Sequence, residues 1–390
     1  MSERVGIVAV AQTRYSADRA DANEGELVYE AVKQVLQETG LKFAKDVSGS
    51  DAFGIDATVT SSQDFLDGRT ISNCNVMSYI GAHHSDEDKV AEDSLNAVYT
   101  AFARVLSGHQ DVVLVAAHCK ESQADLRGVE NAALDPAFLR VLGLDFLSAA
   151  ALQSRRYMYK YGITPQQCAK VVVKNRGNAK KNPFAQESGD ITVADVLGSQ
   201  VLASPIRQLD MKPVSDGACA MILATEKKAK KICSKPIWIK GVSNCYETHH
   251  LGDRDLADCD ALVKAAKKAY SMAGITDPVK QINVAEISEE YSYQELLWME
   301  GLGLCGRGEA GRMIDSGATQ MGGQLPVNPS GGMLSGNPTV VAGMARIAEG
   351  VLQLRGEAGE RQVPGAKLAL AHGFTGMCGA LQGVMILGKA

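Results

Sequence analysis

Side chains that could carry out acid–base chemistry follow two apolar runs of this sequence. Glu289 and Glu290 come directly after INVAEIS (282–288), and Cys119 closes the run DVVLVAAH (111–118). Both runs predict buried strands. A carboxyl group buried at the end of such a strand has a raised pKa and can carry a proton to and from a substrate. The simpler alternative is a pair of glutamates of which one is solvated and one caps a loop.

A glycine-rich loop near the C-terminus, NPSGGMLSGNPTVVAG (328–343), leads into an apolar segment with helical periodicity. The side chain of this loop that could act on a ligand is the amide of Asn337. An amide takes up no proton at neutral pH, but it can donate a hydrogen bond to a carbonyl oxygen. The turn at Ser330, Gly331 and Gly332 would let a thin ligand approach the backbone, because glycine has no side chain to obstruct it.

The remaining candidates are two thiols, a hydroxyl and an imidazole. Cys119 and Cys378 could serve as nucleophiles if they face a pocket, although a buried cysteine is more often inert. His372 lies near Cys378 in the stretch HGFTGMCG. Ser94 opens the apolar segment SLNAVYTAFARVLSG, where the ordinary role of a serine is to cap a helix.

Composition narrows the class of protein. The chain has 390 residues, of which 45% are hydrophobic and 22% charged, and a net charge of −5. These values are typical of a globular protein and give no reason to expect nucleic acid or an anionic membrane as partner. The nine cysteines form no C-x-x-C pair, so we expect reduced thiols, a cytoplasmic location and no metal site in this chain.

Strands and helices are predicted to alternate, and their order occurs twice. Alternation favours a mixed or parallel sheet covered by helices, and two copies suggest two such sheets packed back to back with helices between them. The predicted strands are 5–13, 55–61, 111–118, 236–244, 282–288, 367–373 and 381–389, and the predicted helices are 26–40, 94–108, 260–274 and 339–356. Residues 120–232 break the pattern and are predicted to form a helical excursion. We therefore expect an N-terminal half (1–119), a loop domain (120–232) and a C-terminal half (233–390).

Several long phrases of the chain resemble the thiolase superfamily, and within it the sterol-carrier-type and archaeal-type thiolases. They include RRYMYKYGIT, KNRGNAKKNP, VLASPIRQLDMKPVSDGACAMILA, LPVNPSGG and EGVLQLRGEAGERQV. The resemblance implies a duplicated thiolase fold with α-β-α-β-α layers, an α/β architecture of two mixed sheets with an inserted loop domain. It also implies coenzyme A as a substrate and a homodimer whose 111–118 strands pair across the dimer axis.

The chain departs from the family at its catalytic positions. The family's nucleophilic cysteine opens a helix, but the corresponding window KVAEDSLNA (89–97) has no cysteine and offers Ser94. Asn337 stands where the family has its activating histidine, whereas His372 is retained. The family's His-Asp-Cys-Phe motif is replaced by Ser288, Glu289, Glu290 and Tyr291. The usual cysteine and histidine machinery is therefore absent.

The resemblance places the coenzyme A site in the loop domain, where basic side chains concentrate. Lysine and arginine suit phosphate groups, and the arginine fork suits them best. Without the family context, such a charge run would be read as a solvated surface. The candidates are Arg155, Arg156, Lys174 and Arg176, together with the turn at Ser330, Gly331 and Gly332.

Three functions follow as hypotheses. The first is thiolysis of a β-ketoacyl-CoA by altered residues, with a small zinc-ribbon/OB-fold subunit as partner. The phrase SSQDFLDGRTISN (61–73) resembles members of the superfamily that act together with such a subunit, and it suggests benzoylsuccinyl-CoA as substrate. The second is a catalytically silent scaffold or CoA-binding subunit. The third is retro-aldol cleavage of a β-hydroxyacyl-CoA, which needs no cysteine and would use Glu289, Glu290 or Tyr291.

Overall fold

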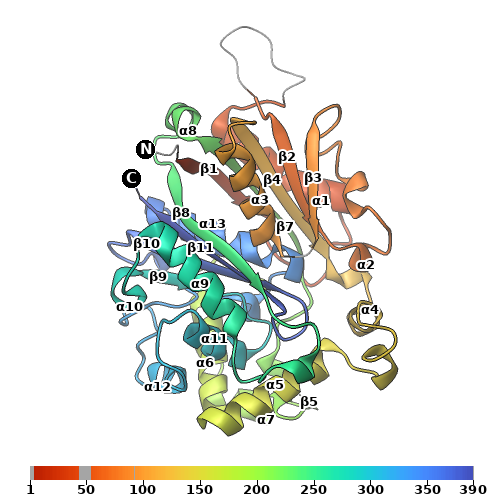
Figure 1. The fold of residues 1–390 in the computed structure, drawn as a ribbon, viewed down its shortest axis with the longest axis vertical. Helices are drawn as coiled ribbons and strands as arrows, with labels where there is room; N and C mark the ends of the chain where they lie inside the picture. The colour runs from red at the N-terminus through yellow and green to blue at the C-terminus, as the bar shows by residue number, and fades with distance from the viewer. Residues whose placement is uncertain (1–3, 44–53, 92, 390) are drawn as a thin grey trace.

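Most strands of the protein join into one mixed sheet, and β5 and β6 form a separate two-stranded sheet. A computed structural model describes residues 4–43, 54–91 and 93–389. Its main sheet has nine strands in the order β3-β2-β4-β7-β1-β8-β11-β10-β9 (Figure 1). The strands are β1 (Val5–Gln12), β2 (Ala57–Ser62), β3 (Asp86–Ala91), β4 (Val112–Lys120), β7 (Asp216–Thr225), β8 (Ile237–Tyr246), β9 (Val284–Glu286), β10 (Leu368–Thr375) and β11 (Leu381–Gly388).

This sheet consists of two halves that meet at a short junction. The N-terminal half ends at β1 and the C-terminal half begins at β8. Among the described residues, these two strands pair through Gly6 with Trp238 and Ile7 with Ile237. The two predicted sheets are therefore present as two halves, and these pairs make them continuous. Parallel pairs occur in each half, between β2 and both β3 and β4, and between β9 and β10.

Helices cover both halves and fill the space between them. Helix α1 packs on the N-terminal half, α9 packs on the C-terminal half, and α3 and α13 contact each other and both halves. The bounds are α1 (Glu24–Thr39), α3 (Ser94–Leu106), α9 (Asp260–Ala273) and α13 (Ala342–Arg355). Each of the three spaces between sheet and helices has its own cluster of buried apolar side chains. This arrangement confirms the predicted α-β-α-β-α layers.

The loop domain lies against one end of the sheet (Figure 1). Its elements are α4 (Leu126–Ala132), α5 (Phe146–Tyr161), α6 (Pro165–Ala179), α7 (Val193–Gly198), β5 (Val201–Ala203) and β6 (Ile206–Arg207). Strand β7 and helix α8 (Glu226–Ile232) fall within the predicted 120–232 segment, but β7 is an interior strand of the N-terminal half. The excursion from the sheet therefore ends before β7 and not at residue 232.

Smaller helices complete the chain around the sheet ends. They are α2 (Asp64–Asp67), α10 (Pro278–Gln281), α11 (Ser292–Gly301) and α12 (Ala310–Asp315). Helix α11 packs on α6 of the loop domain and so ties that domain to the C-terminal half.

The position of β4 corrects the predicted dimer contact. Strand β4 contains the predicted 111–118 segment, and it is hydrogen-bonded to β2 on one side and to β7 on the other. Because both of its edges are occupied, this strand cannot pair with a second copy, and that prediction is wrong. In the described sheet the edge strands are β3 and β9. The sequence of β3, DEDKVA, is charged, as is common at exposed sheet edges.

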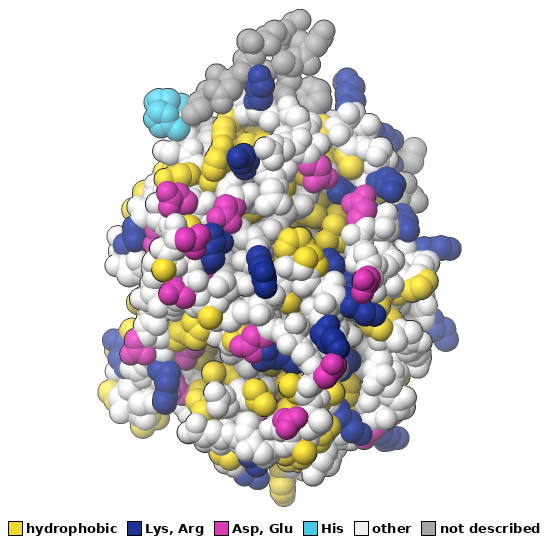
Figure 2. All heavy atoms as spheres, turned by 180° about the vertical axis from the view of Figure 1, so that it is seen from behind, with side chains coloured by type: hydrophobic (Ala, Val, Ile, Leu, Met, Phe, Trp, Pro, Cys, Tyr) yellow, Lys and Arg dark blue, Asp and Glu magenta, His cyan; other side chains and the backbone are white. Residues whose placement is uncertain are grey.

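The surface carries both signs of charge. On the face shown in Figure 2, acidic and basic side chains are interspersed, which fits the small net charge of −5. Among the described residues, no helix is both long and apolar enough to cross a membrane.

Candidate active site

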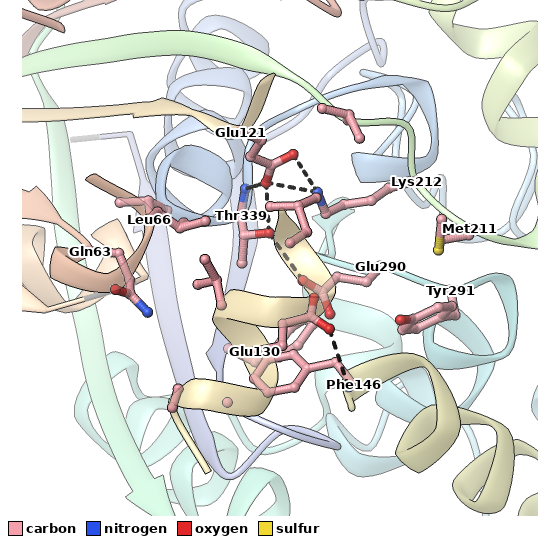
Figure 3. A pocket seen from close by; sticks show the side chains of 17 residues that line it. Gln63, Leu66, Glu121, Glu130, Phe146, Met211, Lys212, Glu290, Tyr291 and Thr339 are labelled. Carbon is pink, nitrogen blue, oxygen red and sulfur yellow. Dashed lines mark hydrogen bonds and ion pairs between the residues drawn. The ribbon is translucent and has the colours of Figure 1, made fainter. Parts of the chain in front are cut away.

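A cavity of about 100 Å³ lies where the loop domain meets the sheet (Figure 3). Its wall includes residues that follow β2 and β4, the end of β10 and helix α4, so several elements converge on it. Ligands of α/β proteins commonly bind at the carboxyl ends of strands. The lining residues are Gln63, Leu66, Glu121, Leu126, Val129, Glu130, Ala133, Phe146, Met211, Lys212, Val214, Glu290, Tyr291, Thr339, Val340, Phe374 and Gly376.

A buried ion pair forms one polar side of the cavity. Lys212 Nζ lies 2.8 Å from both carboxylate oxygens of Glu121. Burial alone would lower the pKa of Lys212, but the neighbouring charges of Glu121 and Glu290 together outweigh it and raise the pKa overall. The backbone N–H groups of Ser215 (3.0 Å) and Thr339 (2.8 Å) also donate to Glu121. Glu121 is therefore held as a carboxylate, and the charge of Lys212 is largely compensated.

Two more carboxyl groups lie beside this pair. Thr339 Oγ1 is 3.0 Å from Glu121 Oε1 and 3.1 Å from Glu290 Oε1, so its hydroxyl joins the two groups (Figure 3). Burial, and then the nearby charge of Glu290, raise the pKa of Glu130 to about 8. Two carboxyl groups in one poorly solvated site do not both ionise readily. At neutral pH Glu130 therefore keeps its proton beside Glu290, and the cavity holds a proton donor next to a possible acceptor.

Tyr291 adds a second donor to the cavity. Its ring is buried, and burial followed by the charge of Glu290 raises the pKa of its hydroxyl well above the usual value. The tyrosine therefore stays neutral and can donate a hydrogen bond. Backbone contacts hold Glu290 and Tyr291 in place, because the Lys212 N–H donates to the Glu290 carbonyl (2.8 Å) and Met211 forms a β-bridge with Tyr291.

Glu289 lies outside the cavity, although it neighbours Glu290 in sequence. Its carboxyl group accepts hydrogen bonds from Asn175 Nδ2 (3.0 Å) and Asn328 Nδ2 (3.1 Å), both of which also reach Glu295. Lys174 Nζ in turn lies 2.8 Å from Glu295. Burial, and then the charge of Glu295, raise the pKa of Glu289. This network fixes the loop domain to the sheet and leaves Glu290 as the glutamate of the pair that faces the cavity.

The polar side chains of the glycine-rich loop (328–343) also form hydrogen bonds to other residues of the protein. The Asn337 side-chain oxygen accepts a hydrogen bond from Arg346, which pairs with Glu286 (2.9 Å). Ser330 donates to the same Glu286 through its backbone N–H (2.9 Å) and its hydroxyl (2.7 Å). A Cβ on Gly332, whose φ is 66°, would collide with Glu289. The glycine turn therefore brings the backbone close to a buried glutamate.

Ser94 lies at the junction of α3 and α13. Asp93, and not Ser94, is the N-cap of α3: its carboxylate accepts from the N–H of Leu95 (2.9 Å) and from that of Gly343 (3.0 Å) at the start of α13. The Ser94 hydroxyl accepts from the Met344 N–H at 3.0 Å. Because Ser94 is fully buried, this geometry favours a structural role.

The predicted thiols and the imidazole lie in buried positions. Burial, with the charge of Glu121 as the next cause, raises the pKa of Cys119 well above its usual value, and burial raises that of Cys378 to about 12. His372 Nε2 lies 2.7 Å from Gln382 Oε1, and burial lowers the pKa of the imidazole to about 4. Of the described residues lining the cavity, none is a cysteine or a histidine.

The predicted coenzyme A contacts separate into two groups. Arg155 and Arg156 are exposed on α5, where Arg155 reaches Ser204 (3.1 Å) and Arg156 makes a bidentate pair with Asp255. Lys174 is buried against Glu295, and Arg176 is buried against Glu187. A phosphate could reach these last two only by displacing a carboxylate. Their role, and that of the glycine turn at Ser330, Gly331 and Gly332, stays a prediction.

Sequence reasoning did not single out Glu121, Glu130, Lys212 or Thr339. Glu121 follows strand β4 just as Glu290 follows β9, so the rule that identified Glu290 could also have found it. Glu130 lies on a short helix of the loop domain and Lys212 on the return to the sheet. Glu130 and Lys212 reach the cavity only through the tertiary structure, and no local sequence pattern indicates that they do.

Comparisons with known proteins agree with this fold over the whole chain. A family model for the thiolase C-terminal domain-like family matches residues 243–389. An acetyl-CoA acetyltransferase of Methanothermobacter thermautotrophicus is 34% identical over 386 residues, covering 96% of this chain and 97% of that protein. The benzoylsuccinyl-CoA thiolase subunit BbsB of Thauera aromatica is 35% identical over 233 residues, covering 59% and 60%.

Solved structures give the same result. The Ltp2-ChsH2(DUF35) aldolase superposes with a TM-score of 0.84 and 25% identity, covering 99% of this chain and 98% of that chain. Human mitochondrial 3-ketoacyl-CoA thiolase superposes with a TM-score of 0.73 and 16% identity, covering 100% and 99%, and so supports the fold alone.

Proposed function

This chain belongs to the thiolase superfamily of acyl-CoA enzymes, and from that premise we propose that it cleaves a β-hydroxyacyl-CoA by a retro-aldol reaction. The observation that carries the proposal is the content of the cavity. Its described lining has carboxyl groups, a tyrosine and a lysine, but no cysteine or histidine. Thiolysis by Cys119 or Cys378 would require a thiolate, and burial raises the pKa of both thiols.

The proposed reaction balances without a co-reactant. Glu290 takes the proton of the β-hydroxyl group, and the electrons of that O–H bond form a carbonyl while the Cα–Cβ bond breaks. The electrons of the broken bond enter the thioester as an enolate, whose oxygen accepts hydrogen bonds from Glu130 and Tyr291. The enolate carbon then takes a proton from Glu130. The products are an aldehyde or ketone and a shortened acyl-CoA.

The environments of the two glutamates fit these opposite roles. A general acid and a general base can share one site when their surroundings push their pKa values apart. Glu130 has a pKa raised to about 8 and so is protonated at neutral pH. Glu290 lies 3.1 Å from the Thr339 hydroxyl, which is also in contact with the Glu121–Lys212 pair. The similarity to the Ltp2-ChsH2(DUF35) aldolase supports the same reaction class.

Coenzyme A is proposed to bind with its phosphates near Arg155 and Arg156. Both guanidinium groups are on the exposed face of α5, within the loop domain. We expect Arg155→Ala to raise the KM for an acyl-CoA roughly tenfold with kcat unchanged, because a charge-assisted phosphate contact is lost. Lys230→Ala, on exposed α8, is the matched control. An unchanged KM for Arg155→Ala would show that Arg155 does not bind a phosphate of coenzyme A.

We further propose a homodimer and a small zinc-ribbon/OB-fold subunit as partners. The names of two similar proteins support a subunit arrangement, since one is Ltp2-ChsH2(DUF35) and the other is a thiolase subunit. The loop domain exposes Phe138, Val141 and Leu142 next to the segment that lines the cavity. We expect the small subunit to co-purify with the wild type and to be lost on Val141→Asp, with exposed Tyr246→Asp as control. Co-purification that is unchanged in Val141→Asp would exclude this surface.

The function is tested by cleavage of a β-hydroxyacyl-CoA by the chain co-expressed with the small subunit, with free CoA omitted. We expect a carbonyl product and a shortened acyl-CoA. Glu290→Gln should lower kcat by about 10²–10⁴-fold, the usual contribution of a positioned general base. Cys378→Ala should keep wild-type kcat. Cleavage that requires free CoA and disappears in Cys119→Ala or Cys378→Ala would establish thiolysis, and CoA binding without turnover would leave a silent subunit.

A further inference from the structure

We infer that the cavity selects acyl groups that are apolar and carry no negative charge, and that it rejects acyl groups with a free carboxylate. This inference rests on the proposed function, because it concerns the substrate of the same site. It follows from the charges and the apolar surface that face the cavity.

The charge balance of the lining residues is negative. Three carboxyl groups face the cavity, those of Glu121, Glu130 and Glu290, and Lys212 is the one cation among the described lining residues. The Lys212 ammonium lies 2.8 Å from both oxygens of Glu121, so its charge is already compensated. Even with Glu130 protonated, the carboxyl groups of the described lining outnumber its one cation. A carboxylate on the substrate would lose its hydration and gain no cation in return.

Most of the remaining wall is apolar. It consists of aliphatic, thioether and aromatic side chains, which bind hydrocarbon groups by excluding water. These residues are Leu66, Leu126, Val129, Ala133, Phe146, Met211, Val214, Val340 and Phe374, with the ring of Tyr291 beside them. A volume of about 100 Å³ suits a substituent on the order of one ring.

One consequence concerns benzoylsuccinyl-CoA, the substrate suggested by the sequence. Its succinyl part carries a free carboxylate, which this charge balance disfavours. The described cavity offers that group no uncompensated cation. The preferred substrates are instead aryl or alicyclic β-hydroxyacyl thioesters whose side chain is uncharged.

A matched set of thioesters tests the inference by binding alone. The probes are 3-phenylpropanoyl-CoA and its para-carbamoyl and para-carboxy derivatives, which lack the β-hydroxyl group and cannot undergo the retro-aldol reaction. The carbamoyl and carboxy probes have similar size and differ in charge. We expect isothermal titration calorimetry of the complex to give a Kd at least tenfold weaker for the carboxy probe than for the carbamoyl probe. Equal or tighter binding of the carboxy probe would overturn the inference.

Variants identify the source of the selectivity. Glu290→Gln removes one carboxyl group from the wall of the cavity and should reduce the difference between carboxy and carbamoyl probes at least threefold. Val129→Lys adds a cation to the α4 side of the cavity and should do the same, with Val129→Met as its matched control. A difference that persists unchanged in both charge variants would show that charge is not its cause.

The two proposals can fail separately. If the phenyl probe binds but no β-hydroxyacyl-CoA is cleaved, the retro-aldol proposal fails and the charge selectivity can still hold. If the hydroxyacyl substrate is cleaved but the carboxy probe binds as tightly as the carbamoyl probe, only the substrate inference fails. If none of the three probes binds, the substrate inference is contradicted, and the cleavage assay alone decides the retro-aldol proposal.

Discussion

At the scale of single residues, the main feature of the candidate site is a pair of carboxyl groups that can hold and release protons. Glu130 and Glu290 share one cavity, and burial together with the charge of Glu290 raises the pKa of Glu130 to about 8. Thr339 lies within hydrogen-bond distance of both Glu290 and Glu121. The described lining of the cavity therefore provides carboxyl and hydroxyl groups that can carry out acid–base chemistry. Asn337, which is predicted to stand where the family has its activating histidine, is part of a buried network with Arg346.

The protonated form of Glu130 predicts a specific pH dependence. Because the proposed reaction uses Glu130 as a proton donor and its pKa is raised to about 8, kcat should fall as the pH rises through about 8. Glu130→Gln keeps a donor but cannot titrate, so its residual activity should lack this alkaline limb. The measurement is kcat from pH 6 to 10, with exposed Glu360→Gln as control. An alkaline limb that is the same in Glu130→Gln and the wild type would assign the titration to another group.

At the scale of elements, one aspartate organises the two central helices. The buried carboxylate of Asp93 accepts a hydrogen bond from the first turn of α3 and another from the first turn of α13. Ser94 adds a third contact, because its hydroxyl accepts from the Met344 N–H. Asp93 and Ser94 thus join two helix N-termini, whose partial positive charge suits an aspartate.

Stability measurements distinguish these roles. Asp93→Ala removes the acceptor for two helix N-termini and should lower the free energy of unfolding by about 2–4 kcal/mol, since one cap contributes about 1–2 kcal/mol. Ser94→Ala removes one hydrogen bond and should cost about 1 kcal/mol while kcat stays within twofold. Urea unfolding and the cleavage assay provide the two measurements. Loss of activity in a folded Ser94→Ala protein would restore Ser94 as a nucleophile candidate.

The elements were more predictable than the site. The predicted helix 94–108 is α3 (Ser94–Leu106), and the predicted strand 381–389 is β11 (Leu381–Gly388), because apolar periodicity is a local property of the chain. Whether β4 lies inside a sheet or at its edge depends on partners distant in sequence, and here the prediction was wrong. For the same reason Glu290 was identified from its strand, whereas Lys212, whose partner Glu121 is 91 positions away, was not.

At the scale of the whole molecule, burial sets how stability responds to pH. His372 is fully buried in β10 beside Gln382, and its pKa is lowered to about 4. The unfolded chain takes up this proton near pH 6.5 and the folded chain only near pH 4, so between these values the unfolded state binds more protons. Stability contributed by neutral His372 is therefore lost progressively as the pH falls from 6.5 to 4.

The size of this effect is measurable by comparison with a variant. From pH 6.5 to 5 the contribution of His372 should fall by about 2 kcal/mol, since one pKa unit corresponds to about 1.4 kcal/mol. Buried carboxyl groups with raised pKa values, such as Glu130, act in the opposite direction, so the wild type must be compared with His372→Gln. Urea unfolding at several pH values should show the difference between the two proteins narrowing towards pH 5. A constant difference would mean that His372 does not titrate in this way.

The central claim is that a carbon–carbon bond is cleaved without a thiol nucleophile, and product analysis with isotopically labelled CoA tests it most directly. The chain with its small subunit is incubated with a β-hydroxyacyl-CoA or the matching β-ketoacyl-CoA in the presence of labelled free CoA. The account predicts that the hydroxyacyl substrate yields a free aldehyde or ketone and an unlabelled shortened acyl-CoA, and that the ketoacyl substrate is not cleaved. Release of the distal fragment as a labelled CoA thioester from the ketoacyl substrate would contradict it.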